Sequence, residues 1–502
     1  MSKTGNNDSH KASTGVNGLD NILKGGLPRN RLYLLEGNPG TGKTTLGLQF
    51  LLEGARNGER GVYITLSETK DELTAVARSH GWSLDGLDIC DLTISENSLT
   101  NNSNYTVFHP SEVELDETTQ AVLEAVERIK PARVVFDSLS EMRLLARDAL
   151  RYRKQILALK QYFMGKSCTV LLLDDHTSEE SDRQLESIAH GVINLEYIPP
   201  VYGKQRHRLR TLKMRGVNFQ SGYHDFNIET GGLAVFERLT AIEHEKELKT
   251  GGLSSGLPEL EQLLGALDYG TSTMILGPAG IGKSTLALMY ACKAAERGER
   301  AALYLFDESI STMYARTSAL GLDIKGHVEA GRITVRQIDP AELSPGEFTH
   351  MVCREVEDNN ARVVVIDSLN GYLMATPEER FLTMQFHEML SYLGRKSVVT
   401  LLIMAQYGLV GNMQTPVDIS YMADTVVLLR YFEAGGEVRQ AISVVKKRTG
   451  KHERNIREFR IDSGGIHLGE ALRDFRGILT GVPTYEGKHE KLMEEEDGDA
   501  KQ

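Results

Sequence analysis

The chain reads Gly37-Asn38-Pro39-Gly40-Thr41-Gly42-Lys43-Thr44 between an apolar run, 32–35, and a helical pattern, 45–57. This order of strand, glycine-rich loop and helix matches the phosphate-binding pattern G-x-x-x-x-G-K-[ST]. In such a loop the backbone N–H groups surround a phosphate, the lysine reaches its outer oxygens, and the Ser or Thr hydroxyl holds Mg²⁺. We therefore predict that this octapeptide, together with Thr45, binds ATP.

A second loop of the same pattern follows about 240 residues later. It reads Gly277-Pro278-Ala279-Gly280-Ile281-Gly282-Lys283-Ser284, after the apolar run 274–276 and before the helical pattern 285–297. This loop and Thr285 are predicted to form a second ATP site. Two loops in the same context indicate a duplicated unit. The alternative interpretation is a glycine-rich turn that binds nothing.

The repeat extends beyond the loops. In each copy a buried strand leads to an acidic residue, which is Glu68 of Ser67-Glu68 in the first copy and lies in Asp307-Glu308 in the second. Later apolar runs end at Asp137 and Asp367, the Walker B pattern, in which the carboxylate orients the Mg²⁺ shell. The predicted metal-binding residues are therefore Thr44, Ser284, Asp137 and Asp367.

Strands that alternate with helices, with phosphate loops at the strand ends, predict an α/β fold with mostly parallel sheets covered by helices on both faces. A length of 502 residues allows about three domains or two large ones, and the duplication favours two. The expected segments are a disordered N-terminus (1–12), a first ATPase domain (13–237), a linker (238–252), a second ATPase domain (253–485) and an acidic disordered tail (486–502).

The composition is typical of a protein with sizeable cores, with 40% hydrophobic and 25% charged residues. No apolar run approaches the roughly eighteen residues that span a bilayer, and the polar start does not resemble a signal peptide. We expect a cytoplasmic protein without a membrane partner. Four scattered cysteines without a C-x-x-C pair predict buried, reduced thiols: Cys90, Cys168, Cys292 and Cys353.

The acidic residues suggest bases for phosphoryl transfer. Glu68 is the candidate for polarising an attacking water in the first domain, and its alternative role is a solvated carboxylate. In the second domain Asp307 and Glu308 share the base role. The sequence does not distinguish them, because alternate residues of a strand point to opposite faces.

With these motifs in place, the chain resembles the KaiC family of bacterial clock ATPases from about Ser13 to Pro483. The most specific stretch reads Asp418-Ile419-Ser420-Tyr421-Met422-Ala423-Asp424-Thr425-Val426-Val427-Leu428-Leu429, and the end 475–483 is similar as well. The resemblance implies two tandem RecA-like P-loop domains with ATP and Mg²⁺ as cofactors. It also implies a homohexamer of two stacked rings, with ATP bound between subunits.

The family resemblance further implies a slow ATPase in the first ring and an autokinase, with autophosphatase activity, in the second. The family's adjacent Ser and Thr acceptors correspond here to Ser420 and Tyr421, and Thr415 takes the place of another family threonine. Four basic residues are expected to reach the γ-phosphate of the adjacent subunit's ATP, although basic residues on strands are often only solvated. They are Lys213, Arg215, Lys446 and Arg448, and His452 keeps a family histidine near the nucleotide.

The expected role is a timing or signalling ATPase that acts through protein partners, with a small KaiB-like protein on the first ring. The short acidic tail does not match the family's regulator-binding tail, so a KaiA-like partner is not supported. Two departures from the family are Tyr421 in place of Thr and Ser67 in place of Glu.

Two other functions remain open. One is a RecA-like nucleic-acid motor without kinase activity, with charge from the clusters 147–154 and 204–210. The net charge of −12 argues against a nucleic-acid partner on electrostatic grounds. The other is a scaffold that binds ATP for assembly and barely hydrolyses it.

Overall fold

The computed structural model describes residues 10–93, 110–146, 148–175, 182–199, 203–239, 251–374, 379–408, 420–480 and 484–485. These residues form two compact units, and the boundary along the chain falls after Arg238. The predicted tail 486–502 and most of the predicted linker lie outside the described residues, whereas Lys11 and Ala12 of the predicted N-terminal segment form a short strand.

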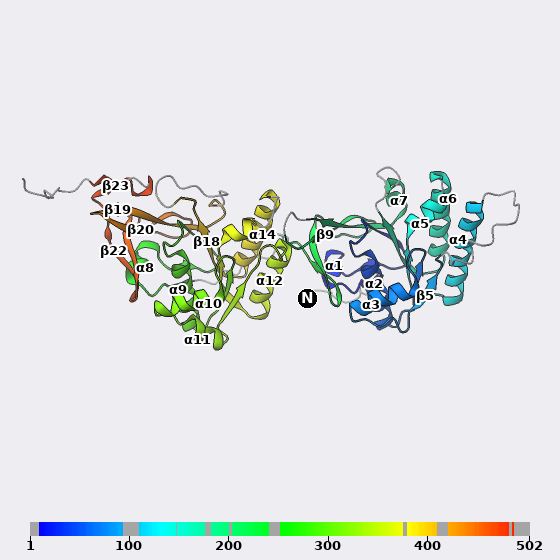
Figure 1. Cartoon of the computed structure of the whole chain (residues 1–502), viewed down its shortest axis with the longest axis horizontal. Coiled ribbons are helices and arrows are strands. Elements are labelled where there is room, and N and C mark those ends of the chain that lie inside the picture. Colours follow the sequence, from blue (N-terminus) through cyan, green and yellow to red (C-terminus); the bar gives the residue numbers. More distant parts are fainter. Residues whose placement is uncertain are drawn as a thin grey trace, which may run out of the picture. The chain divides into compact units, whose positions relative to one another are not determined.

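The first unit is built on a nine-stranded sheet in the order β11-β10-β9-β8-β3-β7-β6-β4-β5. Strands β8, β3, β7, β6, β4 and β5 run parallel, and β9, β10 and β11 extend the sheet in antiparallel fashion. Figure 1 shows helices on both sides of this sheet. The elements are β1 Lys11–Ala12, α1 Asn17–Ile22, β2 Leu27–Pro28, β3 Leu32–Gly37, α2 Lys43–Arg56, β4 Gly61–Thr65, α3 Lys70–Ser79, β5 Asp88–Asp91, α4 Pro110–Ile129, β6 Arg133–Asp137, α5 Leu139–Ala146, α6 Ala149–Met164, β7 Thr169–Asp175, α7 Asp182–Ile188, β8 Gly191–Ile198, β9 Arg206–Met214, β10 His224–Glu229 and β11 Gly232–Phe236.

The central strands of this unit are apolar throughout because both of their faces are buried. Tyr33 and Leu35 of β3 face one hydrophobic cluster with the residues of α2. Leu32 and Leu34 face the opposite cluster, with α4, α5 and α6. The predicted three-layer α/β fold is therefore confirmed, with a three-strand antiparallel extension at one side of the sheet.

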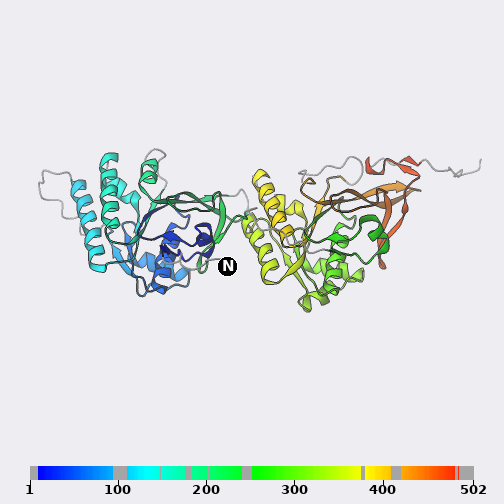
Figure 2. The same ribbon diagram turned by 180° about the vertical axis from the view of Figure 1, so that it is seen from behind.

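The second unit repeats this plan with the sheet order β16-β15-β17-β18-β14-β19-β20-β21-β22 (Figure 2). Its elements are β12 Gly252–Leu253, α8 Pro258–Leu264, β13 Leu267–Asp268, β14 Ser272–Gly277, α9 Lys283–Glu296, β15 Arg300–Leu305, α10 Ile310–Ala319, α11 Ile324–Glu329, β16 Ile333–Gln337, α12 Pro345–Asp358, β17 Ala361–Asp367, α13 Leu369–Met374, α14 Glu379–Arg395, β18 Val399–Ala405, β19 Thr425–Ala434, β20 Glu437–Lys447, β21 Arg457–Asp462, β22 Gly465–Ala471, β23 Phe475–Arg476, η3 Ile478–Thr480 and β24 Thr484–Tyr485.

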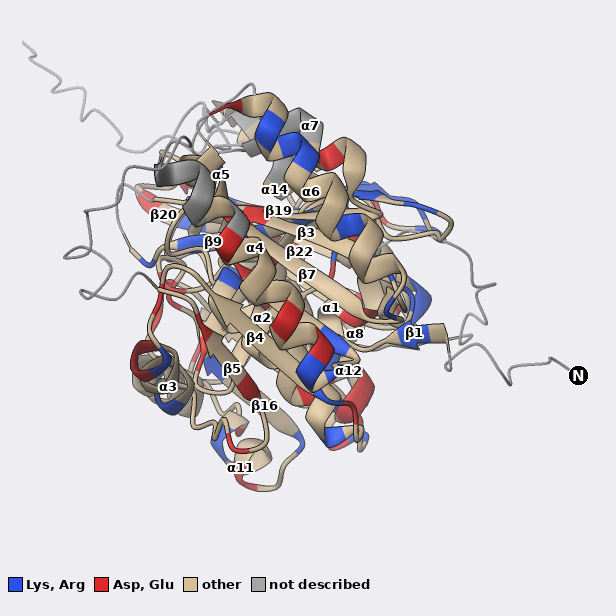
Figure 3. Cartoon of the chain, turned by 90° about the vertical axis from the view of Figure 1, so that its right-hand side faces the viewer, with Lys and Arg blue, Asp and Glu red and all other residues tan. Residues whose placement is uncertain are grey.

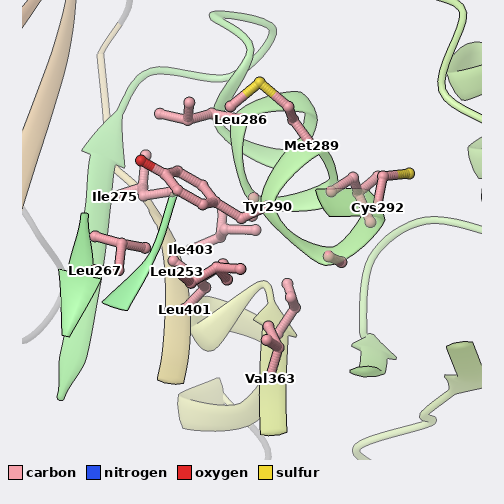
Figure 4. Close-up of a cluster of buried hydrophobic side chains, with 14 of the residues drawn as sticks. Leu253, Leu267, Ile275, Leu286, Met289, Tyr290, Cys292, Val363, Leu401 and Ile403 are labelled. Carbon is pink, nitrogen blue, oxygen red and sulfur yellow. The ribbon is translucent and has the colours of Figure 1, made fainter. Parts of the chain in front are cut away.

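The core of the second unit forms where α9 packs on the sheet. Tyr290 of α9 extends toward Ile275 of β14 and lies among aliphatic side chains that include Leu267 and Leu253 (Figure 4). This contact packs the middle of α9 against the centre of the sheet.

The run from Ala361 to Asp367, which forms strand β17, contains one residue more than the corresponding run from Ala132 to Asp137 in the first unit. Its ladder with β15 shifts register between Arg300 and Ala301, which is the signature of a β-bulge. Beyond the shift, Leu305 pairs with Asp367, as Thr65 pairs with Asp137 in the first unit. The bulge absorbs the extra residue, so that the Walker B aspartate keeps its place at the strand end.

All four cysteines are free thiols, and three of them are buried while Cys90 is half-buried. Among the described helices, none is both long and apolar enough to cross a membrane.

Candidate functional site

Each phosphate loop joins the carboxyl end of a central strand, β3 or β14, to the first turn of α2 or α9. Gly42 and Gly282 cap these helices with φ values of 91° and 100°, in the left-handed region. A Cβ atom would lie 2.8 Å from Ile228 Cδ1 at Gly42 and 2.1 Å from Ile461 Cδ1 at Gly282. Both the conformation and the space therefore require glycine at these two positions.

Lys43 of the first domain is buried and folds back over its own loop. Its Nζ donates to the carbonyl oxygens of Gly37 at 2.7 Å and Asn38 at 3.0 Å. It also forms an ion pair of 2.6 Å with Asp175 Oδ1 at the end of β7. Lys283 of the second domain donates to Pro278 O at 2.7 Å, and burial lowers the pKa of its amine to about 8.

The predicted metal-binding residues lie beside the loops. In the first domain, Thr44 Oγ1 is 3.4 Å from Asp137 Oδ2, which also accepts a 2.5 Å hydrogen bond from Tyr63. Burial raises the pKa of Asp137, although the bond from Tyr63 and the charge of Lys43 lower it. In the second domain Ser284 donates to Asp367, whose pKa is also raised by burial.

These residues fit a nucleotide with Mg²⁺. The glycine loops leave room that a side chain would fill, and a hydroxyl and a carboxylate converge beside each lysine. Mg²⁺ is usually held in this way, by one or two protein oxygens together with phosphate oxygens. Thr44 and Asp137, or Ser284 and Asp367, would hold the metal, and Lys43 or Lys283 would contact the phosphates. Thr45 and Thr285 are instead buried and contact His80 and Arg316, respectively.

Glu68 lies directly after β4, beside this first site. Its backbone is fixed by Thr65 Oγ1, which accepts from Glu68 N at 3.0 Å and donates to Glu68 O at 2.7 Å. Among the described residues, Glu68 Oε2 has no hydrogen-bond partner although it is buried. Burial and the neighbouring charges of Asp137, Glu72 and Asp175 raise the pKa of this carboxyl group. A half-buried carboxylate with an unused, buried oxygen has the properties expected of a base for water.

The two candidate bases of the second domain have different partners. Glu308 is clamped by Arg316, which donates through Nε at 3.1 Å and Nη2 at 2.7 Å. Asp307 accepts a short hydrogen bond from Ser368, the residue after the Walker B aspartate, and it is exposed. Of the two carboxylates, Asp307 is thus the one without a cationic clamp. Both border a hollow of about 420 Å³ whose lining includes Gly280, Gly282, Lys283, Ser284, Thr285 and Asp367.

The predicted basic fingers lie at the other end of each sheet, which we call the amino edge because the parallel strands begin there. Lys213 pairs with Val192 at the start of β8, and its Nζ donates to Glu186 O. Arg215 donates to Ser187 O at 2.8 Å. The phosphate loops lie at the opposite, carboxyl edge, so Lys213 and Arg215 do not reach the loop of their own domain.

The second domain repeats this arrangement around the candidate phosphosites. Lys446 Nζ donates to Ser420 O at 3.0 Å and Ala423 O at 2.7 Å, and Arg448 Nη2 donates to Tyr421 O at 2.7 Å. The Ser420 side chain is half-buried, whereas Tyr421 is 57% exposed. Thr415 lies outside the described residues, and His452 follows four residues after Arg448 in the segment between β20 and β21. Arg448 also lines a hollow of about 530 Å³ at this edge, together with Asp424, Ser272 and His387.

Four contact residues were not identified from the sequence. Tyr63 donates a hydrogen bond to Asp137, and Asp175 forms an ion pair with Lys43. Arg316 donates to Glu308, and Ser368 donates to Asp307. Ser368 has a sequence signal, because it belongs to the repeated Asp-Ser-Leu. Asp175 and Arg316 have no equivalent in the other copy, so the repeat could not point to them.

Comparison with known proteins gives one consistent match. The family model described as "ATPase: KaiC" matches twice, over residues 12–240 and 253–473. The circadian clock protein KaiC3 of Synechocystis sp. is 27% identical over 490 residues, which cover 96% of each chain. The circadian clock oscillator protein KaiC of Synechococcus elongatus is 26% identical over 497 residues, covering 96% of this chain and 94% of the relative.

Proposed function

The chain belongs to the KaiC family of ATPases, and on this premise we propose that it is a hexameric timing or signalling protein whose first domain hydrolyses ATP and whose second domain phosphorylates its own chain. The predicted acceptor is Ser420, with Tyr421 and Thr415 as further acceptors. Removal of the phosphate by the same domain completes the proposed cycle.

One observation carries the proposal that phosphate passes between subunits. The segment 420–424 lies at the amino edge, where Asp424 N donates to Ser272 O at the start of β14. The phosphate loop begins at the other end of this strand. The six residues of β14 separate the two by about 16 Å at 3.3 Å per residue. A hydroxyl at 420 or 421 therefore needs a nucleotide from another copy of the second domain.

Each residue near the nucleotide has a proposed role. Lys43 and Lys283 bind the outer phosphate oxygens, and Glu68 orients a water in the first domain. Asp307 accepts the proton of the acceptor hydroxyl in the second domain, while the Arg316 clamp keeps Glu308 in place. Mg²⁺, when bound, neutralises charge on the phosphates. Lys213, Arg215, Lys446 and Arg448 would contact the γ-phosphate presented by the adjacent subunit.

A homohexamer with a KaiB-like protein on the first ring is the assembly that this proposal includes. The relatives named above are circadian clock proteins, which supports a timing role. The soluble, cytoplasmic location expected from the sequence belongs to the same proposal.

The charge distribution does not favour a nucleic-acid motor. Arg208 and Arg210 of the basic cluster 204–210 form ion pairs with Glu196 and lie against the ring of Tyr223. Acidic and basic positions are interspersed on helix α3 (Figure 3). Nucleic-acid binding would need uncompensated cations along one track.

The test is incubation of the full chain with Mg²⁺ and γ-labelled ATP, followed by phosphosite mapping by mass spectrometry. Label is expected on Ser420, and it should be lost in both Ser420→Ala and Lys283→Ala. When the two variants are mixed under conditions that allow subunit exchange, label should return on Ser420 of the Lys283→Ala chain, because that chain keeps the acceptor and its neighbour supplies the donor.

Turnover of ATP without label on residues 415–425 would contradict the autokinase and leave an ATPase. If the mixture of the two variants does not restore label on Ser420, transfer between subunits is contradicted.

A further inference from the structure

The two phosphate loops differ in one neighbour that the repeat does not explain. In the first sheet, Gly37 at the start of the loop pairs with Asp175 at the end of β7. In the second sheet, the equivalent Gly277 pairs with Ala405 at the end of β18. The same backbone position therefore presents a carboxylate to one lysine and a methyl group to the other.

Asp175 is held in place independently of Lys43. The hydroxyl of Ser140 accepts from Asp175 N at 3.0 Å and lies 3.4 Å from Asp175 Oδ2. The neighbouring Asp174 is fixed by Arg143 Nη2 at 2.5 Å. The Asp175 carboxylate is thus anchored to α5 and is not a loose surface group.

The second domain has an equivalent backbone anchor at this strand end, but no carboxylate at the position of Asp175. Asn370, at the position of Ser140, bonds the backbone of Ala405 in both directions, at 2.7 Å and 3.0 Å. Among the described residues, no carboxylate lies within 4.0 Å of Lys283 Nζ, whereas Asp175 lies 2.6 Å from Lys43 Nζ. The backbone at the end of β7 and at the end of β18 is held by equivalent hydrogen bonds. The two strand ends therefore differ mainly in the charge that they place near the lysine.

We infer that Asp175 is an internal counter-ion for Lys43 that competes with the phosphates of ATP, and that it makes nucleotide binding weaker and exchange faster in the first domain than in the second. Lys43 must leave a partly buried ion pair to bind phosphate, and the Asp175 carboxylate then lies near the negative phosphate oxygens. Both effects oppose binding, because charge-assisted hydrogen bonds are among the stronger polar interactions and like charges repel. Asp175 is a positioning residue here, since it acts through Lys43.

The inference rests on ATP binding by the first domain and not on the proposed autokinase. The full chain with Lys283→Ala isolates the first site, and the probe is a fluorescent N-methylanthraniloyl ATP with Mg²⁺. Asp175→Ala and Asp175→Asn should each lower the dissociation constant about tenfold, which corresponds to about 1.4 kcal/mol. Release of the probe, measured by chasing with unlabelled ATP, should slow in both variants.

The reciprocal variant is the matched control. In the full chain with Lys43→Ala, Ala405→Asp should raise the dissociation constant of the second site about tenfold. A purely structural role for Asp175 predicts a lower melting temperature with weaker or unchanged binding, and tighter binding is not expected from it.

Unchanged or weaker binding in folded Asp175→Asn would overturn the inference, as would unchanged binding in Ala405→Asp. If the Asp175 variants do not fold, the Ala405→Asp result decides. Absence of probe binding to every first-site chain would refute ATP binding by that domain, and the inference with it. Equilibrium binding requires no phosphoryl transfer, so a failed phosphosite experiment leaves this result intact.

Discussion

Glu68 and Glu308 occupy the same position of the repeat, yet in the described part of the chain only Glu308 of the two is clamped by an arginine. We predict that Glu68→Gln, in the Lys283→Ala chain, lowers ATP turnover about 10²- to 10⁴-fold, which is the usual contribution of a general base. Binding of the fluorescent nucleotide should persist. In the same chain Glu308→Gln is the matched control and should leave turnover unchanged. Equal loss in both variants would show that Glu68 is not the base.

The buried side chain of Arg133 affects both the stability of the first domain and the pH dependence of that stability. Arg133 is fully buried, and it donates to Glu59 at 2.5 Å, Ser13 O at 2.7 Å and Phe50 O at 2.7 Å. Arg133→Met should lower the free energy of unfolding of the first domain by about 3 kcal/mol, because it removes the donor of one buried and two partly buried hydrogen bonds. The single Trp82 lies in this domain, so urea unfolding followed by its fluorescence isolates the effect.

The Arg133–Glu59 pair also predicts an acid sensitivity. Burial raises the pKa of Glu59, but hydrogen bonds from Arg29 and Arg133 outweigh it and hold the pKa below the ordinary 4.5. A carboxyl group with a lowered pKa contributes its full stabilisation above its unfolded pKa and loses it as the pH falls through the folded value. Stability of the first domain should therefore fall below about pH 4.5, and this fall should be smaller in Glu59→Gln.

At the scale of elements, helix caps position the candidate bases. Helix α3 begins directly after Glu68 with a capping box, in which Thr69 Oγ1 accepts from Glu72 N at 3.3 Å and Glu72 Oε2 accepts from Thr69 N at 2.7 Å. Thr69→Ala should cost about 1 kcal/mol of unfolding free energy and should reduce first-domain turnover. Thr74→Ala on the same helix removes only a hydroxyl bond to Lys70 O, so its turnover should remain that of the parent chain. Equal turnover in both variants would exclude a role for the cap.

Most of the element plan could be predicted from the sequence, because fully buried strands read as continuous apolar runs and the loops follow a fixed pattern. The buried strand expected before Ser67-Glu68 is β4, Gly61–Thr65, and the expected helix 45–57 is α2, Lys43–Arg56. The antiparallel extension was not predicted, because its half-exposed strands β9 and β20 mix polar and apolar residues. The pairing of Lys43 with Asp175 depends on the register of two strands far apart in sequence, which no local pattern specifies.

At the scale of the whole molecule, the two domains should contribute separately to turnover. Lys43→Ala and Lys283→Ala should each lower the hydrolysis by their own domain about a hundredfold or more, because each removes a charge that stabilises the transition state. Steady-state turnover of the two chains then gives the share of each domain. A first domain that barely hydrolyses ATP would show no fall on Lys43→Ala, and would favour the role of a nucleotide-gated scaffold for that half.

The second phosphate loop and the proposed acceptor, Ser420, lie at opposite edges of one sheet. Each second domain therefore has a donor side and a separate acceptor side. A twofold pair would match each loop with the partner's acceptor only if both edges lay within one shared interface, because residue i of one copy then meets residue j of the other and the reverse. In the proposed ring the two edges face different neighbours, so copies follow one another head to tail through heterologous contacts, and such a series either closes or grows into a filament. Until the last copy meets the first, one loop has no recipient and one hydroxyl has no donor. Closure of the series is then itself a condition for every subunit to take part in the chemistry.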